Sequence, residues 1–320
     1  MAKANSKLFW KKLFYASSFF PFERLLLWIF QGEIMQRFFL WQTVWLSAFF
    51  CACNSAKNVS PEVANHKVAS VEFIDVGQGL SALFQIKEDD FAAVYDTGND
   101  SVGFWDSLQS RGIRHLDFAV ISHWHRDHVG GLLEWNGNIP IDTIFYSPDS
   151  GGIWLRDSVL NLSKRFRAQA IKVQRGKSLP CGDWNCKVLW PSEFAKFTGN
   201  NASVVLQISD GTFRVLLTGD LESDAEESLL DLSHDLRAEI LQVGHHGSGN
   251  SSSLHFLEQI APKIAVISVG RENSYGHPTP TTLNKLTLVT GDSSRILRTD
   301  RHSNILFEWK FRKGLWQGNF

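Results

Sequence analysis

The feature that most constrains the fold is a run of four metal-ligand side chains within six residues, His123-Trp124-His125-Arg126-Asp127-His128. Imidazole nitrogens and carboxylate oxygens are the atoms that Zn²⁺ and similar divalent ions accept in proteins. The run directly follows residues 116–121, which read as a buried strand, and it precedes Gly130-Gly131. A solvated, histidine-rich loop is the alternative, and this density of ligands disfavours it. We predict a metal site on an extended turn, where alternate residues face one ion and the Asp127-His128 pair faces a second.

Two other predicted strands end in further ligand-type residues. Residues 212–218 are followed by Gly219-Asp220, and residues 240–243 by Gly244-His245-His246. Each is weak evidence alone, because aspartate and histidine at a strand end are often ordinary turn residues. Together with the first run they supply the six or seven ligands that two ions need. The sequence therefore predicts a binuclear site in which Asp220 is suited to bridge the two ions.

Length and charge leave several functions open. The 320 residues suffice for one large domain or two modest ones. The formal net charge of −1 provides no general attraction to nucleic acid or to an anionic membrane. A local groove can still be basic on a nearly neutral protein, so a nucleic-acid substrate is not excluded.

Short apolar stretches alternate with helix-like segments from residue 71 onward. We expect strands at residues 71–74, 81–86, 92–95, 116–121, 203–208, 212–218, 240–243 and 265–269. We expect helices at residues 152–168, 221–232, 254–260 and 281–289. Many strands mixed with helices, each strand running into a polar turn, are typical of a layered α/β architecture.

The first 53 residues have a different composition from the rest. Residues 1–34 mix basic and aromatic side chains without a clear period, and residues 38–56 carry no charge. We interpret residues 1–53 as an export signal that effectively starts at Met35, with Cys53 as the lipidated residue of a lipoprotein. The alternatives are an uncleaved transmembrane anchor and a buried hydrophobic helix. The first two place the remaining chain outside the cytoplasm, attached to the membrane through its N-terminus, with residues 54–70 as a linker.

Four cysteines are present, and none has the spacing of a zinc ribbon or a thioredoxin-like site, so a cysteine-based metal site is not expected. Cys181 and Cys186 flank a turn-like stretch. A disulfide between them is plausible if the domain is exported, whereas in the cytoplasm they would be two thiols.

Several motifs together resemble one known family. They are Phe73 to Gly79, Asp96-Thr97-Gly98, Ser122 to Leu132, Asn200 to Leu206, Thr218-Gly219-Asp220, His245 to Ser248, Tyr275 to Pro278 and Arg298 to Arg301. In this order and spacing they resemble the metallo-β-lactamase domain of ComEC-type competence proteins, over about residues 71–308. The resemblance implies an αββα four-layer sandwich with two metal ions at one edge of the sheets. We place this hydrolase domain at residues 71–310 and a tail at 311–320. Proteins of that type also contain a multi-span channel, and we expect a solitary catalytic domain without one.

The resemblance assigns roles to the ligand-type residues. His123 and His125 would bind the first ion, and Asp127 and His128 the second. Asp220 would bridge the two ions.

The strand-end histidines and two asparagines complete this implied site. One of His245 and His246 would complete the second ion, with His246 favoured as the ligand and His245 as the substrate-facing neighbour. The third histidine that many superfamily members give to the first ion is absent, and Asn200-Asn201 stands near its place. Zn²⁺ is the expected metal, but an asparagine oxygen suits a softer ion poorly, so Mn²⁺ is the alternative. The ComEC branch usually has aspartate where this chain has His125, which favours a more zinc-like first site.

Other residues near the motifs are expected to assist. Asp75 and Asp96 could accept the outer N–H of a ligating histidine, with ordinary turn capping as the alternative. His277 could stabilise developing charge or protonate a leaving group, with a plain surface histidine as the alternative. Asn200, Asn201 and Ser203 are expected to orient ligands or contact substrate. The residues expected to take part in catalysis are Asp127, His245 and His277.

We therefore expect a metal-dependent hydrolase, a phosphodiesterase or nuclease that uses a metal-activated hydroxide. DNA or RNA is the first substrate class, and a phosphodiester on a lipid or a choline-bearing glycan the second. The alternatives are a hydrolase of esters, thioesters or lactams, and a non-catalytic, metal-stabilised binding module on the cell surface.

Overall fold

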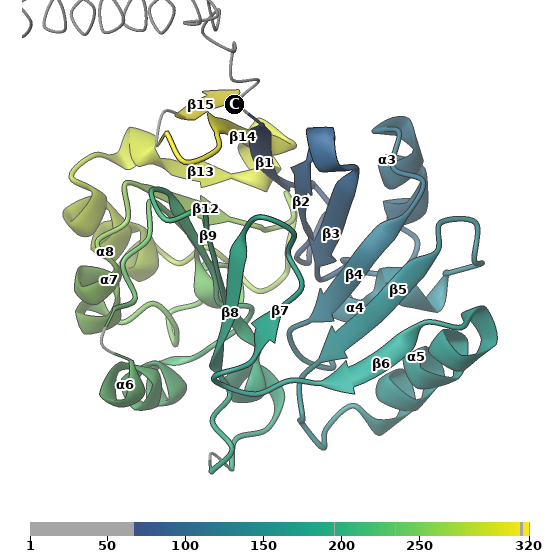
Figure 1. The fold of residues 1–320 in the computed structure, drawn as a ribbon. Coiled ribbons are helices and arrows are strands. Elements are labelled where there is room, and N and C mark those ends of the chain that lie inside the picture. The colour runs from purple at the N-terminus through teal and green to yellow at the C-terminus, as the bar shows by residue number, and fades with distance from the viewer. Residues whose placement is uncertain (1–66, 195, 234, 314–315, 320) are drawn as a thin grey trace, which may run out of the picture. The chain divides into compact units, whose positions relative to one another are not determined.

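The computed structural model describes residues 67–320 except 195, 234, 314–315 and 320, and arranges them as two β-sheets between layers of helices (Figure 1). Residues 66–320 form one compact unit. The predicted export signal, its Cys53 and nearly all of the predicted linker lie outside the described residues. Within the described part of the chain, no helix has the length and hydropathy needed to cross a membrane.

The first sheet has eight strands in the order β15-β14-β1-β2-β3-β4-β5-β6. Its strands are β1 (Val68–Phe73), β2 (Ala82–Ile86), β3 (Phe91–Tyr95), β4 (Leu116–Ile121), β5 (Ile141–Tyr146), β6 (Gln169–Lys172), β14 (Ile305–Lys310) and β15 (Trp316–Asn319). The second sheet has seven strands in the order β13-β12-β11-β10-β9-β8-β7. Its strands are β7 (Ser178–Leu179), β8 (Asn185–Trp190), β9 (Val205–Ser209), β10 (Arg214–Leu217), β11 (Ile240–Gln242), β12 (Ile264–Ile267) and β13 (Ile296–Arg298).

The central strands carry apolar side chains on both faces, because successive side chains of a strand point to opposite faces of the sheet. Each sheet can therefore pack against the other sheet on one face and against helices on the other. In β4, Phe118 and Val120 pack into the apolar cluster between the two sheets. Ala119 and Ile121 face the opposite way, into a second cluster beneath α3 (Phe104–Ser110), α4 (Arg126–Leu133) and α5 (Ile153–Phe166). A third cluster packs the outer face of the second sheet against α6 (Ser223–Leu232), α7 (Leu254–Ile260) and α8 (Pro280–Thr290). Three buried interfaces between four layers make the αββα sandwich, which confirms the expected fold.

The parallel strands bring the predicted ligands to one edge. Strands β3, β4, β5 and β6 are mutually parallel, as are β10, β11, β12 and β13. Polar residues that follow neighbouring parallel strands share an edge of the sheet, which is where open α/β sheets bind ligands. His123 follows β4, Asp220 follows β10, and His245-His246 follow β11.

The ends of the domain differ from the predicted boundaries. β1 begins at Val68, inside the predicted linker, because residues 68–73 pair with β14 and residues 69–73 pair with β2. The predicted tail at residues 311–320 contains β15, which pairs antiparallel with β14 at the sheet edge. A short edge strand carries little periodic signal, which is why the sequence did not reveal it.

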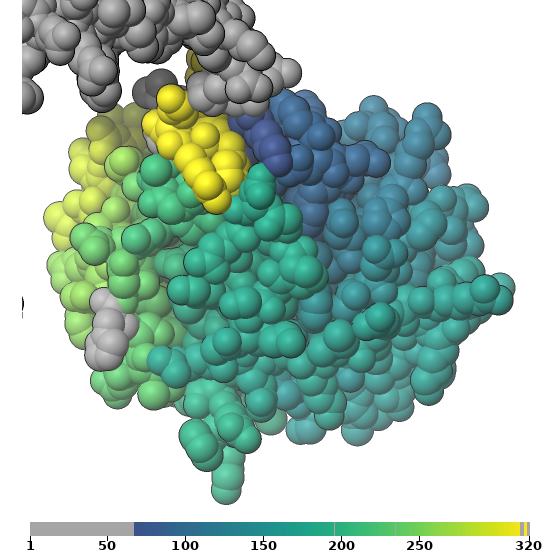
Figure 2. Space-filling model, in the orientation of Figure 1, coloured from purple at the N-terminus to yellow at the C-terminus, as the bar shows by residue number. Residues whose placement is uncertain are grey.

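Two connections lie on either side of β8. The turn between β7 and β8 is closed by a disulfide between Cys181 and Cys186. The loop after β8, residues 191–198, projects from the molecule (Figures 1 and 2), and its Phe194 is 88% exposed. This loop leads directly to Asn200-Asn201.

Candidate metal centre

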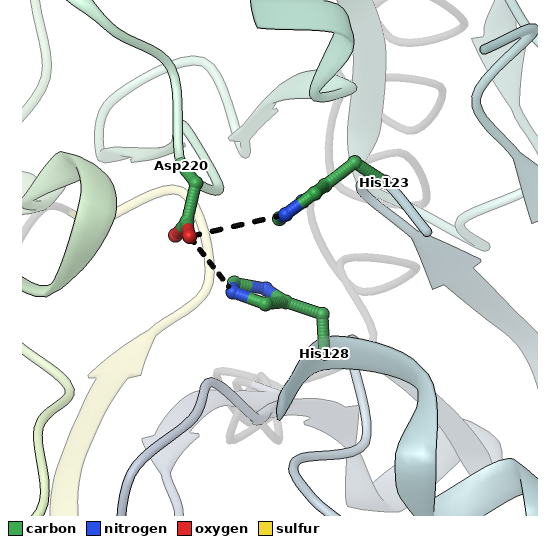
Figure 3. A group of neighbouring side chains, drawn as sticks. All are labelled: His123, His128 and Asp220. Carbon is green, nitrogen blue, oxygen red and sulfur yellow. Dashed lines mark ion pairs between the residues drawn. The ribbon is translucent and has the colours of Figure 1, made fainter. Parts of the chain in front are cut away.

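Two histidines of the ligand run are buried and aimed at Asp220 (Figure 3). His123 lies just after β4, and His128 lies in the first turn of α4. Their Nε2 atoms are 3.8 and 3.1 Å from Asp220 Oδ2. The other ring nitrogen of each is held by a neighbour. His123 Nδ1 is 3.0 Å from Ser122 Oγ, and His128 Nδ1 is 2.7 Å from Asp96 Oδ2. Such contacts fix the orientation of an imidazole and leave Nε2 to act as a ligand.

The turn that carries Asp220 is held by buried polar groups. Gln242 Oε1 accepts from the backbone N–H groups of Thr218 and Gly219, at 2.7 and 2.8 Å, and its Nε2 donates to Gly219 O at 3.0 Å. The backbone N–H of Asp220 donates to Ser203 Oγ at 3.1 Å. Gly219 has φ of +58°, and a Cβ there would lie 2.9 Å from the Ser122 Cβ. The turn therefore needs glycine, and its hydrogen bonds fix the position of the carboxylate.

His246 approaches the same point from the turn after β11. Its Nε2 is 3.3 Å from Asp127 Oδ2 and 3.6 Å from Asp220 Oδ2. Its Nδ1 lies 2.7 Å from the Ser268 carbonyl oxygen. His245 and His246 both have left-handed backbones, with φ of 49° and 54°. This conformation costs about 1–3 kcal/mol per residue, and strain of this kind gathers at functional sites.

The donor set suits a divalent ion. Ligand atoms of His123, His128 and Asp220 lie within 4.8 Å of one another, as do those of Asp127, His128 and His246. Four of these atoms are buried without a hydrogen-bond partner in the described part of the chain, namely Nε2 of His123, His128 and His246, and Oδ1 of Asp220. Each such atom costs roughly 1–3 kcal/mol when left unsatisfied. Cations bound by these two groups would provide partners for the unsatisfied atoms, so the residues fit a metal centre.

The charges of the cluster oppose one another. Burial disfavours the ionised Asp220, but the positive charges of His128 and His246 outweigh burial and hold the pKa of Asp220 well below its ordinary value. Burial likewise disfavours the charged form of His128, yet nearby carboxylates, with Asp220 the strongest, raise its pKa well above the ordinary value. Burial and the charge of His128 lower the pKa of His123 well below the ordinary value. The nearby carboxylates favour the charged form of His128, and a ligating imidazole is neutral, so metal binding at His128 would be coupled to proton release.

His125, predicted to bind the first ion, belongs to neither group of ligand atoms. It is exposed, and its ring centroid is 4.4 Å from that of His123. It stands at the N-cap of α4, where the chain turns from extended to helical. The run is thus a short turn followed by a helix, rather than the extended turn that we predicted. A role for His125 as a ligand stays a prediction.

A polar group borders the centre on the side of His245. Glu222 Oε1 lies 3.1 Å from His245 Nδ1 and accepts from Asn200 Nδ2 at 3.0 Å. His245 Nε2 lies 3.9 Å from Asp220 Oδ2, and the imidazole is partly exposed. The ring of His277 is 5.7 Å away, and burial, then the charge of His245, lower the pKa of His277 below the ordinary value.

Some of the remaining predicted residues contact the metal-ligand residues, and others do not. Asp96 contacts His128 as expected, and Ser203 contacts the backbone of Asp220. Asn201 Oδ1 accepts from the backbone N–H of Glu222 at 3.0 Å, so its contact is structural. Asp75 contacts no ligand histidine among the described contacts. Its Oδ1 accepts from Gly77 N at 3.1 Å, which is the turn capping given as the alternative.

Three contributing residues were not singled out from the sequence. Gln242 lies within the apolar stretch 240–243, Glu222 lies at the start of the expected helix 221–232, and Ser122 begins one of the family motifs. Their contacts join segments far apart in the chain, such as Gln242 with Thr218. No local sequence pattern predicts contacts between such distant segments.

Comparison with known proteins agrees with this geometry. A sequence family described as the metallo-β-lactamase superfamily matches residues 74–271. ComE operon protein 3 of Bacillus subtilis (strain 168) is 31% identical over an alignment of 267 residues that covers 76% of this chain and 33% of that protein. Competence protein ComA of Neisseria gonorrhoeae is 34% identical over 251 residues, 77% of this chain and 33% of that protein. The chain thus spans about a third of the length of these relatives.

Among solved structures, CmlA of Streptomyces venezuelae, a diiron β-hydroxylase, has a TM-score of 0.52 with 13% identity. The likeness covers 74% of this chain and 53% of that one. At this identity it shows the fold alone. Because the same fold carries different chemistries, the reaction has to be argued from the site.

Proposed function

The chain belongs to the metallo-β-lactamase superfamily, and we propose that it is a metal-dependent hydrolase that cleaves phosphodiesters, with nucleic acid as the substrate class. The observation that carries this proposal is the convergence of buried, unpartnered ligand atoms on Asp220. The likeness to competence proteins favours a phosphodiester over a lactam or thioester.

Residues of the two groups would divide between two ions. We propose that His123, with His125, serves one ion, that Asp127, His128 and His246 serve the other, and that Asp220 bridges them. Such ions, when bound, lower the pKa of water and neutralise charge on a phosphate. Zn²⁺ suits the imidazole-rich set, and Mn²⁺ remains the alternative because Asn200 stands where a further histidine was expected.

The surrounding residues would act on the substrate directly. His245 is partly exposed, held by Glu222, and close enough to Asp220 to contact a bound phosphate. The His277 Nδ1 is buried without a described hydrogen-bond partner. We propose that His277 hydrogen-bonds to charge that develops on the phosphate or the leaving oxygen.

Turnover by the purified, metal-loaded chain tests this function. We expect hydrolysis of bis(p-nitrophenyl) phosphate and of single-stranded DNA in Zn²⁺ or Mn²⁺. Cleavage of thioesters or β-lactams instead would support another hydrolase of the fold. Bound metal with no turnover of any of these would leave the non-catalytic binding module.

We also propose export and membrane attachment through residues 1–53, with Cys53 as the lipidated residue, residues 54–67 as a linker and the hydrolase domain from β1 onward. The Cys181–Cys186 disulfide supports export, because disulfides persist mainly in oxidising compartments. Labelling with radioactive palmitate tests the proposal. We expect label in the membrane fraction of the natural chain and its loss in Cys53→Ser, whereas label in neither would contradict lipidation.

A further inference from the structure

Tyr275 presents an aromatic ring to solvent beside the metal centre. Its ring stacks on His277, with centroids 5.9 Å apart and planes 22° from parallel. The residue is nevertheless 67% exposed. His277 covers one face of the ring, so the other face is open.

A row of rings connects this surface to Asp220. The His277 ring stands edge-on to His245, with centroids 5.7 Å apart. His245 Nε2 in turn lies 3.9 Å from Asp220 Oδ2. The open face of Tyr275 therefore lies one ring beyond His277 in this row, on the side away from His277.

The loop that carries Tyr275 is tied down on both sides of it. Asn273 Nδ2 donates to the carbonyl oxygens of Gly270 and His277 at 3.0 and 2.8 Å, and its Oδ1 accepts from the His277 N–H at 3.0 Å. The backbone N–H of Thr279 donates to Gly247 O at 2.9 Å, which joins the loop to the turn of His245 and His246. A ring held in place loses little conformational entropy when a ligand stacks on it.

We propose that the open face of Tyr275 is a subsite for a nucleobase of the strand whose phosphodiester is held at the metal centre. The proposal rests on the proposed phosphodiesterase function, and it makes a base-bearing strand the preferred substrate. Stacking of a base on an aromatic side chain changes affinity by about 5- to 150-fold and tolerates different bases, since every base has a flat π face.

The test compares two oligonucleotides that differ only in their bases. One is a fluorescein-labelled single-stranded decamer, and the other has tetrahydrofuran residues in place of every base. Binding of both is measured by anisotropy in EDTA, and cleavage in Mn²⁺, for the full-length chain and for Tyr275→Ala and Tyr275→Phe. Trp154→Ala is the matched control, because Trp154 is a similarly exposed aromatic residue, at 64%, on α5.

We expect Tyr275→Ala to raise Kd and KM for the base-bearing decamer by about 5- to 150-fold, with kcat nearly unchanged. Tyr275→Phe should restore both constants, and neither variant should alter the constants for the base-free decamer. Equal losses on the two decamers, or no loss on either, would overturn the subsite. Tyr275-dependent inhibition by phosphocholine without any dependence on bases would also overturn it, in favour of a cation–π site.

Failure of the subsite differs visibly from failure of the proposed function. A chain that cleaves the decamer with no dependence on Tyr275 keeps the function and loses the subsite. A chain that cleaves neither decamer but binds bases through Tyr275 keeps the subsite and loses the hydrolase.

Discussion

The contact between Asp96 and His128 gives a quantitative prediction for metal affinity. Asp96 is fully buried, and its two oxygens receive three contacts, from His128 Nδ1 at 2.7 Å, Ser122 N at 2.7 Å and Ser122 Oγ at 2.6 Å. In Asp96→Asn one of those oxygens becomes an NH₂ group that cannot accept a hydrogen bond. Either Ser122 N loses its acceptor or His128 loses the group that holds its proton on Nδ1. In the second case the proton moves to Nε2, the atom aimed at the metal.

We expect Asp96→Asn to weaken metal binding by about 10- to 100-fold, the usual cost of losing a group that orients a ligating histidine. That factor corresponds to about 1.4–2.7 kcal/mol. Competition with a chromogenic chelator at fixed pH measures the dissociation constants of Zn²⁺ and Mn²⁺. Asp75→Asn is the matched control, since this carboxylate caps a turn and should leave affinity unchanged. Unchanged affinity in Asp96→Asn, or an equal loss in Asp75→Asn, would show that the contact between Asp96 and His128 does not set metal affinity.

Three further changes have predictable outcomes. Gly79→Ala should lower metal content and destabilise the fold by about 1–3 kcal/mol, because its Cβ would lie 2.4 Å from the Asp127 carbonyl oxygen; full metal content would contradict this. Burial raises the pKa of Glu226. At pH values between the ordinary and the raised pKa, the folded state therefore keeps a proton on Glu226 that the unfolded state has lost. Stability of the metal-free protein should fall as pH rises through that window, and urea unfolding across pH 4–7 should show a flatter profile for Glu226→Gln than for the natural chain. Reduction of the Cys181–Cys186 disulfide, whose cysteines are 5 residues apart, should cost about 2 kcal/mol in the same assay; no change on adding reductant would mean that the bond does not restrain the unfolded chain.

The parts of the fold that could be read from sequence are those with strong local signals. The expected strand at 116–121 and the expected helix at 254–260 match β4 and α7 residue for residue. The convergence of strand-end ligands also followed from sequence, because parallel strands end at a common edge.

Helix α4 and strand β6 were not predicted from the sequence, because packing against distant residues determines both. Helix α4 contains Gly130-Gly131, which local propensity disfavours in a helix. The structure explains these glycines, since a Cβ at Gly130 would lie 2.3 Å from Asp100 N and one at Gly131 would lie 2.4 Å from Thr97 O. The edge strand β6 has mostly exposed residues, so no apolar stretch marked it.

The directions of the site's side chains also could not be predicted from local sequence. Sequence alone could not separate the adjacent His245 and His246, because their directions depend on two left-handed backbone conformations. In the structure His246 joins Asp127, and His245 turns toward Glu222. The role of Gln242 could not be predicted for a related reason, since its side chain acts through hydrogen bonds to the turn after the neighbouring strand β10.

The number of metal ions bound per chain tests most directly whether Asp220 organises a binuclear centre. The natural chain and Asp220→Asn are saturated with Zn²⁺ or Mn²⁺, dialysed, and measured by mass spectrometry of the metal against protein concentration. We expect two ions per natural chain and fewer than one in Asp220→Asn, because both ions would share this carboxylate. One ion or none in the natural chain, or an unchanged count in the variant, would contradict a binuclear centre organised by Asp220.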